Sequence, residues 1–588
     1  MKSAGHKHAQ VLLVIAASAI GCGKSTTTSP SSATLDAAPD APLVVPLVVP
    51  TVSQPDCTAD AGDWPMFGQN VCNTSSPLFA GAINKDNVGK LKTKWVYDAA
   101  GDVSATPAVV GGYVYVPDWG GMISKLDAST GQVVWSKSVG ALLAGAGDAG
   151  STLAGFISRT TPLVSGGLVI FGTMRNSADL VATLGPGAFL VAIDQNTAAL
   201  KWVIELDPHP AAAITGSPVL EGTRLYIGVS SFEEVFASGV PNYSCCSFRG
   251  SEVAVDVATG NIAWRTHTIS DSLYYAADAG SDGGADDGGS DGGTSPGPAL
   301  SGYAGGAVWS STAVVDRKRQ QLYVTSGNDY NVAPGDPDAG GSQGNMIDAV
   351  IALDLATGQV KWVRSVPEGG QDIWTFSGGG GQDSDFGCGA NLFTATIKGT
   401  PTDLVGAGQK SGVYWAFDPD TGATVWQQQV GPGGHLGGIH WGTATDGVRI
   451  YAGVNNEFST PFALGGSGPQ AGKEITTGAW GALDPATGDF LWQVANPALL
   501  SGPVGGASVN GPLVVVNGVL FAGSMDTDGT MFAFDAATGD VLWSFKSGAT
   551  VYGSPAVVGG VVYWGAGYPS RLGFGNSIKK LYAFEIAD

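Results

Sequence analysis

The sequence is poor in charge, and positive charge is scarcer than negative charge. Charged residues make up 13% of the 588 residues, and 28 Lys and Arg stand against 50 Asp and Glu, which gives a formal net charge of −22. Binding to nucleic acid needs a basic surface, and such a composition does not supply one. We therefore expect no nucleic-acid partner and relate the acidic balance mainly to solubility.

Cysteine is also scarce. The sequence holds six cysteines and lacks a Cys-x-x-Cys-His motif, so it has no site for a covalently bound c-type haem. After Cys22 five cysteines remain, so at least one is unpaired. Cys57 and Cys72 flank the start of the globular part and are candidates for a disulfide, while Cys388 is a candidate free thiol.

The N-terminal apolar run is too short to span a bilayer. Lys2 and Lys7 precede this run, from Val11 to Ile20, which predicts a signal peptide over residues 1–22. Its end resembles a bacterial lipobox, in which Cys22 becomes a lipidated N-terminus; simple secretion is the alternative. We expect export to the periplasm or outer membrane, with the membrane contacted only through this lipid.

Composition divides the remaining chain into a tether and one large domain. Residues 23–62 are mostly Ser, Thr, Ala, Val and Pro, which predicts a flexible tether. Residues 63–588 carry a repeat and form the domain. Within it, residues 276–298 are rich in Asp, Gly and Ser and are interpreted as a solvated acidic insertion.

One short pattern returns along the domain: an apolar residue, Asp, two spacers, Thr-Gly, three residues and Trp. It predicts a strand, a tight turn and a second strand, because Asp caps the turn and Gly supplies a positive φ. The Trp buries its ring between neighbouring units. Seven copies occur, with Ala198 in place of the Gly in the second: Asp127 to Trp135, Asp194 to Trp202, Asp256 to Trp264, Asp354 to Trp362, Asp418 to Trp426, Asp484 to Trp492 and Asp535 to Trp543.

An eighth copy is divided between the two ends of the chain. Leu581 to Glu585 match the start of the pattern, and Leu91 to Trp95 supply the strand that carries the Trp. Pairing of these strands closes a ring and leaves no free sheet edge. The sequence therefore predicts an all-β fold: an eight-bladed β-propeller of four-stranded antiparallel blades, closed by its N- and C-terminal strands.

Several polar stretches are not required by the repeat. They are Asp63 to Gly68, Asp102 to Pro107, Ser158 to Thr160, Cys245 to Ser251, Asp383 to Gly387 and Gly408 to Gly412. With these stretches in this order, the chain resembles the quinoprotein alcohol dehydrogenases, and among them the polyvinyl alcohol dehydrogenase branch. The resemblance runs from about Asp63 to the C-terminus. It implies a propeller that holds pyrroloquinoline quinone (PQQ) and a calcium ion.

The resemblance also implies which residues surround PQQ, a flat anion with three carboxylates and an ortho-quinone. Trp309 matches the ring that forms the floor, with a structural Trp as the alternative. A disulfide between Cys245 and Cys246 would form the lid, with two separate thiols as the alternative. The further cofactor-binding residues implied are Arg159 and Thr215 at the carboxylates, Lys410 near the quinone oxygens, and His440 and Trp441 along the channel.

Calcium requires oxygen ligands with carboxylate charge. Glu233, Asn328 and Asp385 match the calcium ligands of the family, and Glu234 is the alternative to Glu233 as the glutamate ligand. Asp385 is also the predicted catalytic base, which takes the hydroxyl proton of the alcohol, and Asp383 is its rival.

The implied function is oxidation of secondary or polymeric alcohols, such as polyvinyl alcohol, to ketones. Since the chain lacks a haem motif, we expect electrons to pass to a separate cytochrome c or another periplasmic acceptor. The alternative is a lipid-anchored scaffold without a cofactor, similar to the outer-membrane β-barrel assembly lipoprotein. That alternative explains the repeats but not the polar stretches, and the Gly-rich loops do not identify the substrate.

Overall fold

The computed structural model describes thirteen stretches of the chain: residues 56–57, 62–77, 81–145, 153, 155–176, 187–239, 243, 245–275, 302–331, 345–366, 383–499, 509–569 and 575–587. They belong to the compact unit Val52–Asp588. The predicted signal peptide, most of the predicted tether and the predicted insertion at 276–298 lie outside the described residues. Within the described part, no helix is both long and apolar enough to cross a membrane.

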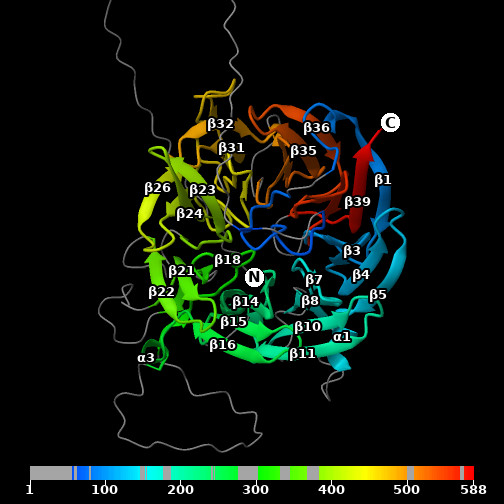
Figure 1. Cartoon of the computed structure of the whole chain (residues 1–588), viewed down its shortest axis with the longest axis vertical. Helices are drawn as coiled ribbons and strands as arrows, with labels where there is room; N and C mark the ends of the chain where they lie inside the picture. The colour runs from blue at the N-terminus through cyan, green and yellow to red at the C-terminus, as the bar shows by residue number, and fades with distance from the viewer. Residues whose placement is uncertain are drawn as a thin grey trace, which may run out of the picture. The chain divides into compact units, whose positions relative to one another are not determined.

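Antiparallel sheets surround a common axis as the eight blades of a propeller, which confirms the predicted fold (Figure 1). The strands of the first four blades, each from the inner to the outer strand, are β2 (Ala108–Val110), β3 (Tyr113–Pro117), β4 (Met122–Asp127) and β5 (Val133–Ser138); β7 (Leu163–Ser165), β8 (Leu168–Gly172), β10 (Ala188–Asp194) and β11 (Leu200–Asp207); β13 (Val219–Glu221), β14 (Arg224–Ser231), β15 (Ser251–Asp256) and β16 (Ile262–His267); and β18 (Val314–Asp316), β19 (Gln321–Thr325), β21 (Ala349–Asp354) and β22 (Val360–Ser365).

The other four blades follow the same plan. Their strands are β23 (Asn391–Ile397), β24 (Thr400–Gly408), β25 (Val413–Phe417) and β26 (Thr424–Gln429); β27 (Ala444–Thr445), β28 (Ile450–Val454), β31 (Ala479–Leu483) and β32 (Phe490–Ala495); β33 (Val514–Val516), β34 (Val519–Gly523), β35 (Thr530–Asp535) and β36 (Val541–Lys546); and β37 (Ala556–Val558), β38 (Val561–Ala566), β39 (Lys580–Ile586) and β1 (Leu91–Asp98).

Short elements occupy the connections between these strands. The two-stranded ribbons are β6 (Phe156–Ile157) with β9 (Met174–Arg175), β17 (Ala304–Gly305) with β20 (Asp329–Asn331), and β29 (Phe462–Ala463) with β30 (Glu474–Ile475); β12 (Ala212–Ala213) pairs with β14. The helical turns are η1 (Val88–Lys90), α1 (Val139–Ala144), α2 (Glu233–Gly239), α3 (Asp271–Tyr274) and η3 (Pro497–Leu499).

The ring closes between the two ends of the described domain, as predicted. β1 pairs with β39 in antiparallel register from Leu91 opposite Ile586 to Asp98 opposite Lys580. In Figure 1 the blue β1 lies beside the red β39. The closing blade is therefore shared by the first and last strands, and its sheet has no gap.

The repeat turns form as their residue types predict. In the copy at Asp354, one carboxylate oxygen accepts hydrogen bonds from the backbone N–H groups of Ala356 and Thr357, at 3.1 and 3.0 Å. Gly358 has a φ of 72°, and a Cβ there would lie 2.5 Å from the Trp264 ring of the neighbouring blade. Glycine is thus required both by the backbone conformation and by the packing of the repeat Trp.

The repeat tryptophans join neighbouring blades. Each indole N–H donates a hydrogen bond of 3.0 to 3.3 Å to a backbone carbonyl of the next blade. The pairs are Trp95 with Ala128, Trp135 with Gln195, Trp202 with Val257, Trp264 with Leu355, Trp362 with Pro419, Trp426 with Pro485, Trp492 with Ala536, and Trp543 with Leu91. The large ring is buried without leaving its N–H unsatisfied.

Residues 64–75 cross the middle of the ring, an arrangement that the repeat does not predict. Their carbonyl groups accept hydrogen bonds from the inner strands of six blades. The donors are the backbone N–H groups of Val109, Val164, Val315, Leu392, Thr445 and Val515. In Figure 1 this dark-blue segment lies over the centre of the propeller.

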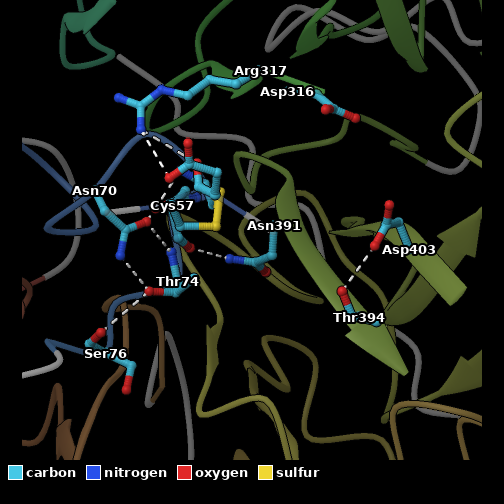
Figure 2. The surroundings of a disulfide bond; sticks show 12 residues. Cys57, Asn70, Thr74, Ser76, Asp316, Arg317, Asn391, Thr394 and Asp403 are labelled. Atoms are coloured by element: carbon cyan, nitrogen blue, oxygen red, sulfur yellow. Dashed lines mark hydrogen bonds and ion pairs between the residues drawn. A yellow bond between two sulfur atoms is a disulfide. The ribbon is translucent and has the colours of Figure 1, made fainter. Parts of the chain in front are cut away.

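A disulfide fixes this segment. Cys57 and Cys72 are bonded, and Cys388 is a buried free thiol, which confirms both predictions. Figure 2 shows Arg317 above Cys57 and Asn70 reaching Thr74; the Asn70 amide donates to the Thr74 hydroxyl at 2.6 Å.

Antiparallel strands place the loops of every blade at two ends. The end that carries the turns between first and second strands, and the Asp-Thr-Gly turns between third and fourth strands, is termed the turn end. The opposite end, termed the site end, carries the loops between second and third strands and the connections from one blade to the next. All loops of one kind therefore meet at one end.

Candidate functional site

All the predicted site residues lie at the site end, although they come from six blades. Connections between blades supply Arg159, Thr215, Trp309, Asp383, Asp385, His440 and Trp441. Loops between second and third strands supply Glu233, Cys245, Cys246, Asn328 and Lys410. Sequence positions up to 282 residues apart, Arg159 and Trp441, thus reach the same end of the propeller.

Asp385 is at the centre of the predicted catalytic group. Its Oδ2 accepts hydrogen bonds from the indole N–H of Trp309 at 2.8 Å and from Lys410 Nζ at 3.0 Å. Its Oδ1 accepts from the backbone N–H of Asn328 at 2.8 Å. Asp383 Oδ2 accepts from the same Lys410 Nζ at 2.8 Å. Both candidate bases are therefore linked to the predicted floor ring. Asp385 accepts directly from Trp309, and Asp383 is linked to Asp385 through the ammonium group of Lys410.

The charge of Lys410 is set by this group. Burial by itself lowers the pKa of Lys410, but the carboxylates of Asp383, Asp385 and Glu234 outweigh burial and raise the pKa above its usual value. Lys410 Nζ also lies 5.0 Å from the centroid of the Trp309 ring. The positively charged Lys410 thus lies over the Trp309 ring and donates hydrogen bonds to two buried carboxylates, those of Asp383 and Asp385.

Glu233 is fully buried, and its carboxylate is hydrogen-bonded within its own loop. Oε1 accepts from the Tyr243 hydroxyl and the Ser247 N–H, both at 2.8 Å, and Oε2 accepts from the Phe248 N–H at 2.7 Å. His209 Nε2 lies 3.5 Å from Oε1. Burial opposes the charge, but His209 and these N–H groups outweigh burial and hold the pKa of Glu233 below its usual value.

Glu234, the other candidate calcium ligand, has different electrostatic partners from Glu233. Burial raises its pKa to about 8, the positive charge of Lys410 lowers it, and the negative charge of Asp385 raises it. Glu234 is thus electrostatically coupled to the Asp385–Lys410 group, whereas Glu233 is coupled to His209. Among the described residues, no three His, Cys, Asp or Glu side chains are arranged to hold a metal ion. The ligand role of Glu233 stays a prediction.

Arg159 lies in a cluster of aromatic rings. Its guanidinium carbon is 4.3 Å from the centroid of Trp441 and 5.6 Å from that of Trp119. Its Nη1 donates to the Tyr568 hydroxyl at 3.2 Å, and Tyr552 stacks on Tyr568 with ring centroids 4.1 Å apart. The cluster places one cation against several π faces.

Trp441 connects this cluster to the predicted floor. Its ring meets that of Trp309 edge to face, with centroids 5.4 Å apart, and its indole N–H donates to the Tyr552 hydroxyl at 2.5 Å. Trp441 has a φ of 58°, a left-handed conformation that is rare for a bulky residue. Such strain is found where the surrounding structure needs a side chain in one particular place.

Thr215 and a group of hydroxyls line a cavity beside Arg159. The Thr215 hydroxyl donates to the carbonyl of Trp309 at 2.9 Å. The other hydroxyl residues of the cavity are Ser104, Thr106, Thr161, Ser217, Ser311 and Tyr552. A cation with convergent hydroxyl groups is a chemical match for a carboxylate.

His440 is 5% exposed and lies 5.9 Å from Trp309, ring centroid to ring centroid. Burial and the charge of Lys410 lower the pKa of His440 to about 3, so the imidazole is neutral near pH 7. Its Nε2 has no hydrogen-bond partner among the described residues. His440 therefore presents an unsatisfied polar atom inside the predicted site.

Cys245 and Cys246 form a disulfide, as predicted. Cys246 is buried in the same apolar cluster against which Trp309 packs, while Cys245 is exposed. The pair thus lies at the site end, and its role as a lid over PQQ stays a prediction.

Sequence reasoning missed four residues of this site: His209, Trp119, Tyr552 and Tyr568. Trp119 had a signal, because it lies outside the repeat position. His209 was one of only six His residues. The two tyrosines follow no pattern that separates them from core residues, since only the ring of blades brings them to Arg159.

Comparison with known proteins gives two family matches. The first, described as the glucose/ethanol/alcohol dehydrogenase β-propeller domain of the PQQ family, covers residues 64–433; the second, described as outer membrane protein assembly factor BamB, covers residues 478–588. The second match contains none of the predicted site residues.

Individual relatives agree with the first match. The chain is 29% identical to a polyvinylalcohol dehydrogenase of Sphingopyxis sp. (strain 113P3), over 83% of this chain and 70% of the relative. It is 27% identical to a polyvinylalcohol dehydrogenase of Pseudomonas sp., over 86% and 73%. The crystal structure of a quinohemoprotein alcohol dehydrogenase from Comamonas testosteroni has the same fold, with a TM-score of 0.62 at 19% identity over 89% of this chain and 80% of that chain.

The match at residues 64–433 spans most of the propeller and contains Asp383, Asp385, Lys410 and Trp309. These residues form the hydrogen-bonded group at the site end. The chain therefore belongs to the PQQ-dependent glucose, ethanol and alcohol dehydrogenase family.

Proposed function

We propose that this protein is a PQQ- and calcium-dependent dehydrogenase that oxidises secondary or polymeric alcohols to ketones. The observation that carries the proposal is the contact of Asp385 with both Trp309 and Lys410, because it places a proton acceptor beside the predicted cofactor floor. The two polyvinylalcohol dehydrogenases among the relatives support the substrate class.

The residues present fit PQQ. Trp309 offers a flat surface, Lys410 lies beside its face, and Arg159 with the Thr215 hydroxyl supplies partners for carboxylates. The unsatisfied Nε2 of His440 offers one further polar contact. PQQ, when bound, supplies the quinone that accepts a hydride from the carbinol carbon.

Calcium would be held by Asn328, Asp385 and one carboxylate of the Glu233–Glu234 pair. The backbone N–H of Asn328 already contacts Asp385. Of the two glutamates, Glu234 is the one coupled to Asp385, while Glu233 is engaged by Tyr243 and its own loop. We therefore favour Glu234 as the third ligand and keep Glu233 as the alternative.

Asp385 is proposed as the general base. It would accept the hydroxyl proton of the alcohol while Lys410 holds its side chain, and that of Asp383, by hydrogen bonds. Asp383 remains the rival, because it accepts a hydrogen bond from the same ammonium group; Asp385 is preferred because its Oδ2 also accepts a hydrogen bond from the floor ring.

The proposed location and electron acceptor are those that the sequence predicts. Since the sequence has no Cys-x-x-Cys-His motif, electrons would pass to a separate cytochrome c or another periplasmic acceptor. Export through the signal peptide and a lipid on Cys22 would place the enzyme in the periplasm or at the outer membrane. The match to BamB covers repeats at residues 478–588 and is consistent with the alternative, a scaffold without a cofactor. That alternative gives no role to the Asp383–Lys410–Asp385 group.

The proposal is tested by assaying the full-length purified protein with PQQ, an artificial electron acceptor and a panel of alcohols. Primary, secondary and polymeric alcohols are compared with calcium, with a chelator and after calcium is restored. We expect turnover of secondary and polymeric alcohols that is lost with the chelator and recovered with calcium. No turnover of any alcohol under any condition would contradict it. Separate Glu233→Gln and Glu234→Gln variants identify the ligand by which one raises the calcium requirement.

A further inference from the structure

Glu252 occupies a position that the repeat otherwise fills with a core side chain. It lies on β15, four residues before the repeat Asp256. The residues at this position in the other blades are all hydrophobic and 0% exposed: Ile123, Leu190, Val350, Tyr414, Trp480, Met531 and Leu581. The fold therefore does not require a carboxyl group at Glu252.

The Glu252 side chain is buried without a partner. It is 2% exposed, and neither carboxyl oxygen has a hydrogen-bond partner among the described residues. Burial raises the pKa of Glu252 well above its usual value. A buried carboxyl group without a partner is costly unless a bound group compensates it.

A small cavity adjoins Glu252 between the blades of β14 and β18. Its volume is about 10 Å³, enough for one particle the size of a water molecule. The polar side chains that line it are Glu252, Ser217, Ser310 and Thr312, and the remaining lining residues are glycine or apolar. The side-chain atoms available to a guest are therefore all oxygens, with no cationic group among them.

The hydroxyl groups leave lone pairs for a guest. The Thr312 hydroxyl donates its proton to the carbonyl of Ser217, at 3.0 Å. Its oxygen can therefore only accept a hydrogen bond from a further group or coordinate a cation. Ser310 Oγ accepts from Thr325 at 2.6 Å, and Ser217 Oγ accepts from the Thr161 N–H at 3.0 Å. Each oxygen is held in place by a hydrogen bond to another segment of the chain.

We propose that this cavity binds one monovalent cation, Na⁺ or K⁺, with Glu252 as its charged ligand. Carboxylate and hydroxyl oxygens are hard ligands that suit an alkali-metal ion. A single carboxylate balances a single positive charge, whereas a divalent ion would leave a net charge buried among apolar residues. The space admits one such ion.

The site adjoins the chain segment that carries the predicted cofactor floor, because Val308 and Ser310 line the cavity on either side of Trp309 in the sequence. Ser310 follows Trp309 in the chain, and residues 217 and 312 are joined by a backbone bridge. A cation here fastens the segment from Trp309 to Thr312 onto the blade of β14. This inference stands on the repeat, the cavity and Glu252, and does not depend on the alcohol dehydrogenase activity.

The test measures thermal unfolding of the full-length protein at constant ionic strength in tetramethylammonium chloride, NaCl or KCl. We expect Na⁺ or K⁺ to raise the midpoint in a saturable way, by about 2 °C or more, and Glu252→Gln to abolish the dependence. Thallium anomalous scattering from a crystal should then place the ion beside Glu252.

Two controls keep the outcomes separable. Glu252→Leu restores the residue type of the other blades, so it should fold and lose only the cation dependence. Equal midpoints in the three salts, together with an infrared carboxylic-acid band at neutral pH that Glu252→Leu removes, would overturn the proposal: Glu252 would then be a neutral acid beside a buried water.

Discussion

The turn end and the site end of the propeller are carried by the same strands but are built differently. At the turn end, the Asp-Thr-Gly turn and the Trp hydrogen bond recur from blade to blade, so each contact has several equivalents. At the site end, the Asp383–Lys410–Asp385 group and the Arg159 cluster each occur once.

This difference separates stability from function. A repeated contact at the turn end is one of several similar contacts that contribute to the free energy of unfolding. Its loss should leave the chemistry of the site unchanged. A unique contact at the site end has no substitute. Burying Lys410 with two carboxylates is a poor way to gain stability, since desolvation offsets the attraction, so the group is better explained by a function at the site.

The largest effect is expected at Asp385. Asp385→Asn keeps the size of the side chain but removes the proton acceptor, so we expect kcat to fall by about 10³-fold while PQQ still binds. Turnover by the reconstituted variant and titration with PQQ check the two halves of this expectation. Asp383→Asn is the matched control: if it alone abolishes turnover, Asp383 is the base.

The next largest effect is expected at Lys410. Lys410→Met leaves Asp383 and Asp385 buried without their cation, which should lower the free energy of unfolding by about 3–5 kcal/mol. Urea denaturation followed by tryptophan fluorescence measures the change. The control, Lys546→Met, removes an exposed ion pair with Asp528 and should leave the urea midpoint unchanged. Both ion pairs lie at the site end, so the control isolates burial: equal effects of the two variants would contradict the burial of Lys410 with two carboxylates.

At the turn end, Gly358 tests packing against a repeat Trp. Gly358→Ala forces a left-handed φ on alanine and drives its Cβ into the Trp264 ring, whereas Gly399→Ala meets the same strain in open space. We expect Gly358→Ala to cost about 1–3 kcal/mol more than Gly399→Ala in urea denaturation, with PQQ affinity unchanged in both. Weaker PQQ binding in Gly358→Ala would show that the two ends are coupled.

The smallest effect is a pH slope from His440. Its pKa is about 3 in the folded protein and 6.5 in the reference state, so between these values the unfolded chain binds the extra proton and stability falls as pH falls. His440→Asn should remove this contribution, on the order of 1 kcal/mol between pH 6.5 and 5.5. Urea midpoints at several pH values measure it; an identical slope in both proteins would mean that His440 is not buried as described.

The turn end could be predicted from sequence because its physics is local. Asp354, Gly358 and the following Trp362 lie within nine residues; the tight turn requires Asp354 and Gly358, and Trp362 recurs at a fixed distance after them. The ring closure could be predicted from the same pattern. Leu91 to Trp95 form a strand that ends in the Trp but has no repeat Asp before it, and Leu581 to Glu585 begin the pattern without its Thr-Gly or Trp.

The site end could be predicted only through family resemblance. Nothing local in the sequence joins Trp309 to Asp385 or Arg159 to Tyr568, because these contacts arise from the curvature of the whole ring. Residues 64–75 illustrate the same limit: their hydrogen bonds to six blades depend on the ring being formed. Glu252 is an intermediate case, since the repeat shows that it is unusual but not what surrounds it.

The central claim, a PQQ site beside Asp385 and Lys410, is tested most directly by equilibrium titration of the full-length protein with PQQ, followed by the quinone absorbance with and without calcium. The account predicts saturable binding of one PQQ per chain that requires calcium and is weakened by Trp309→Ala. Absence of binding in both conditions, in a folded protein, would contradict it.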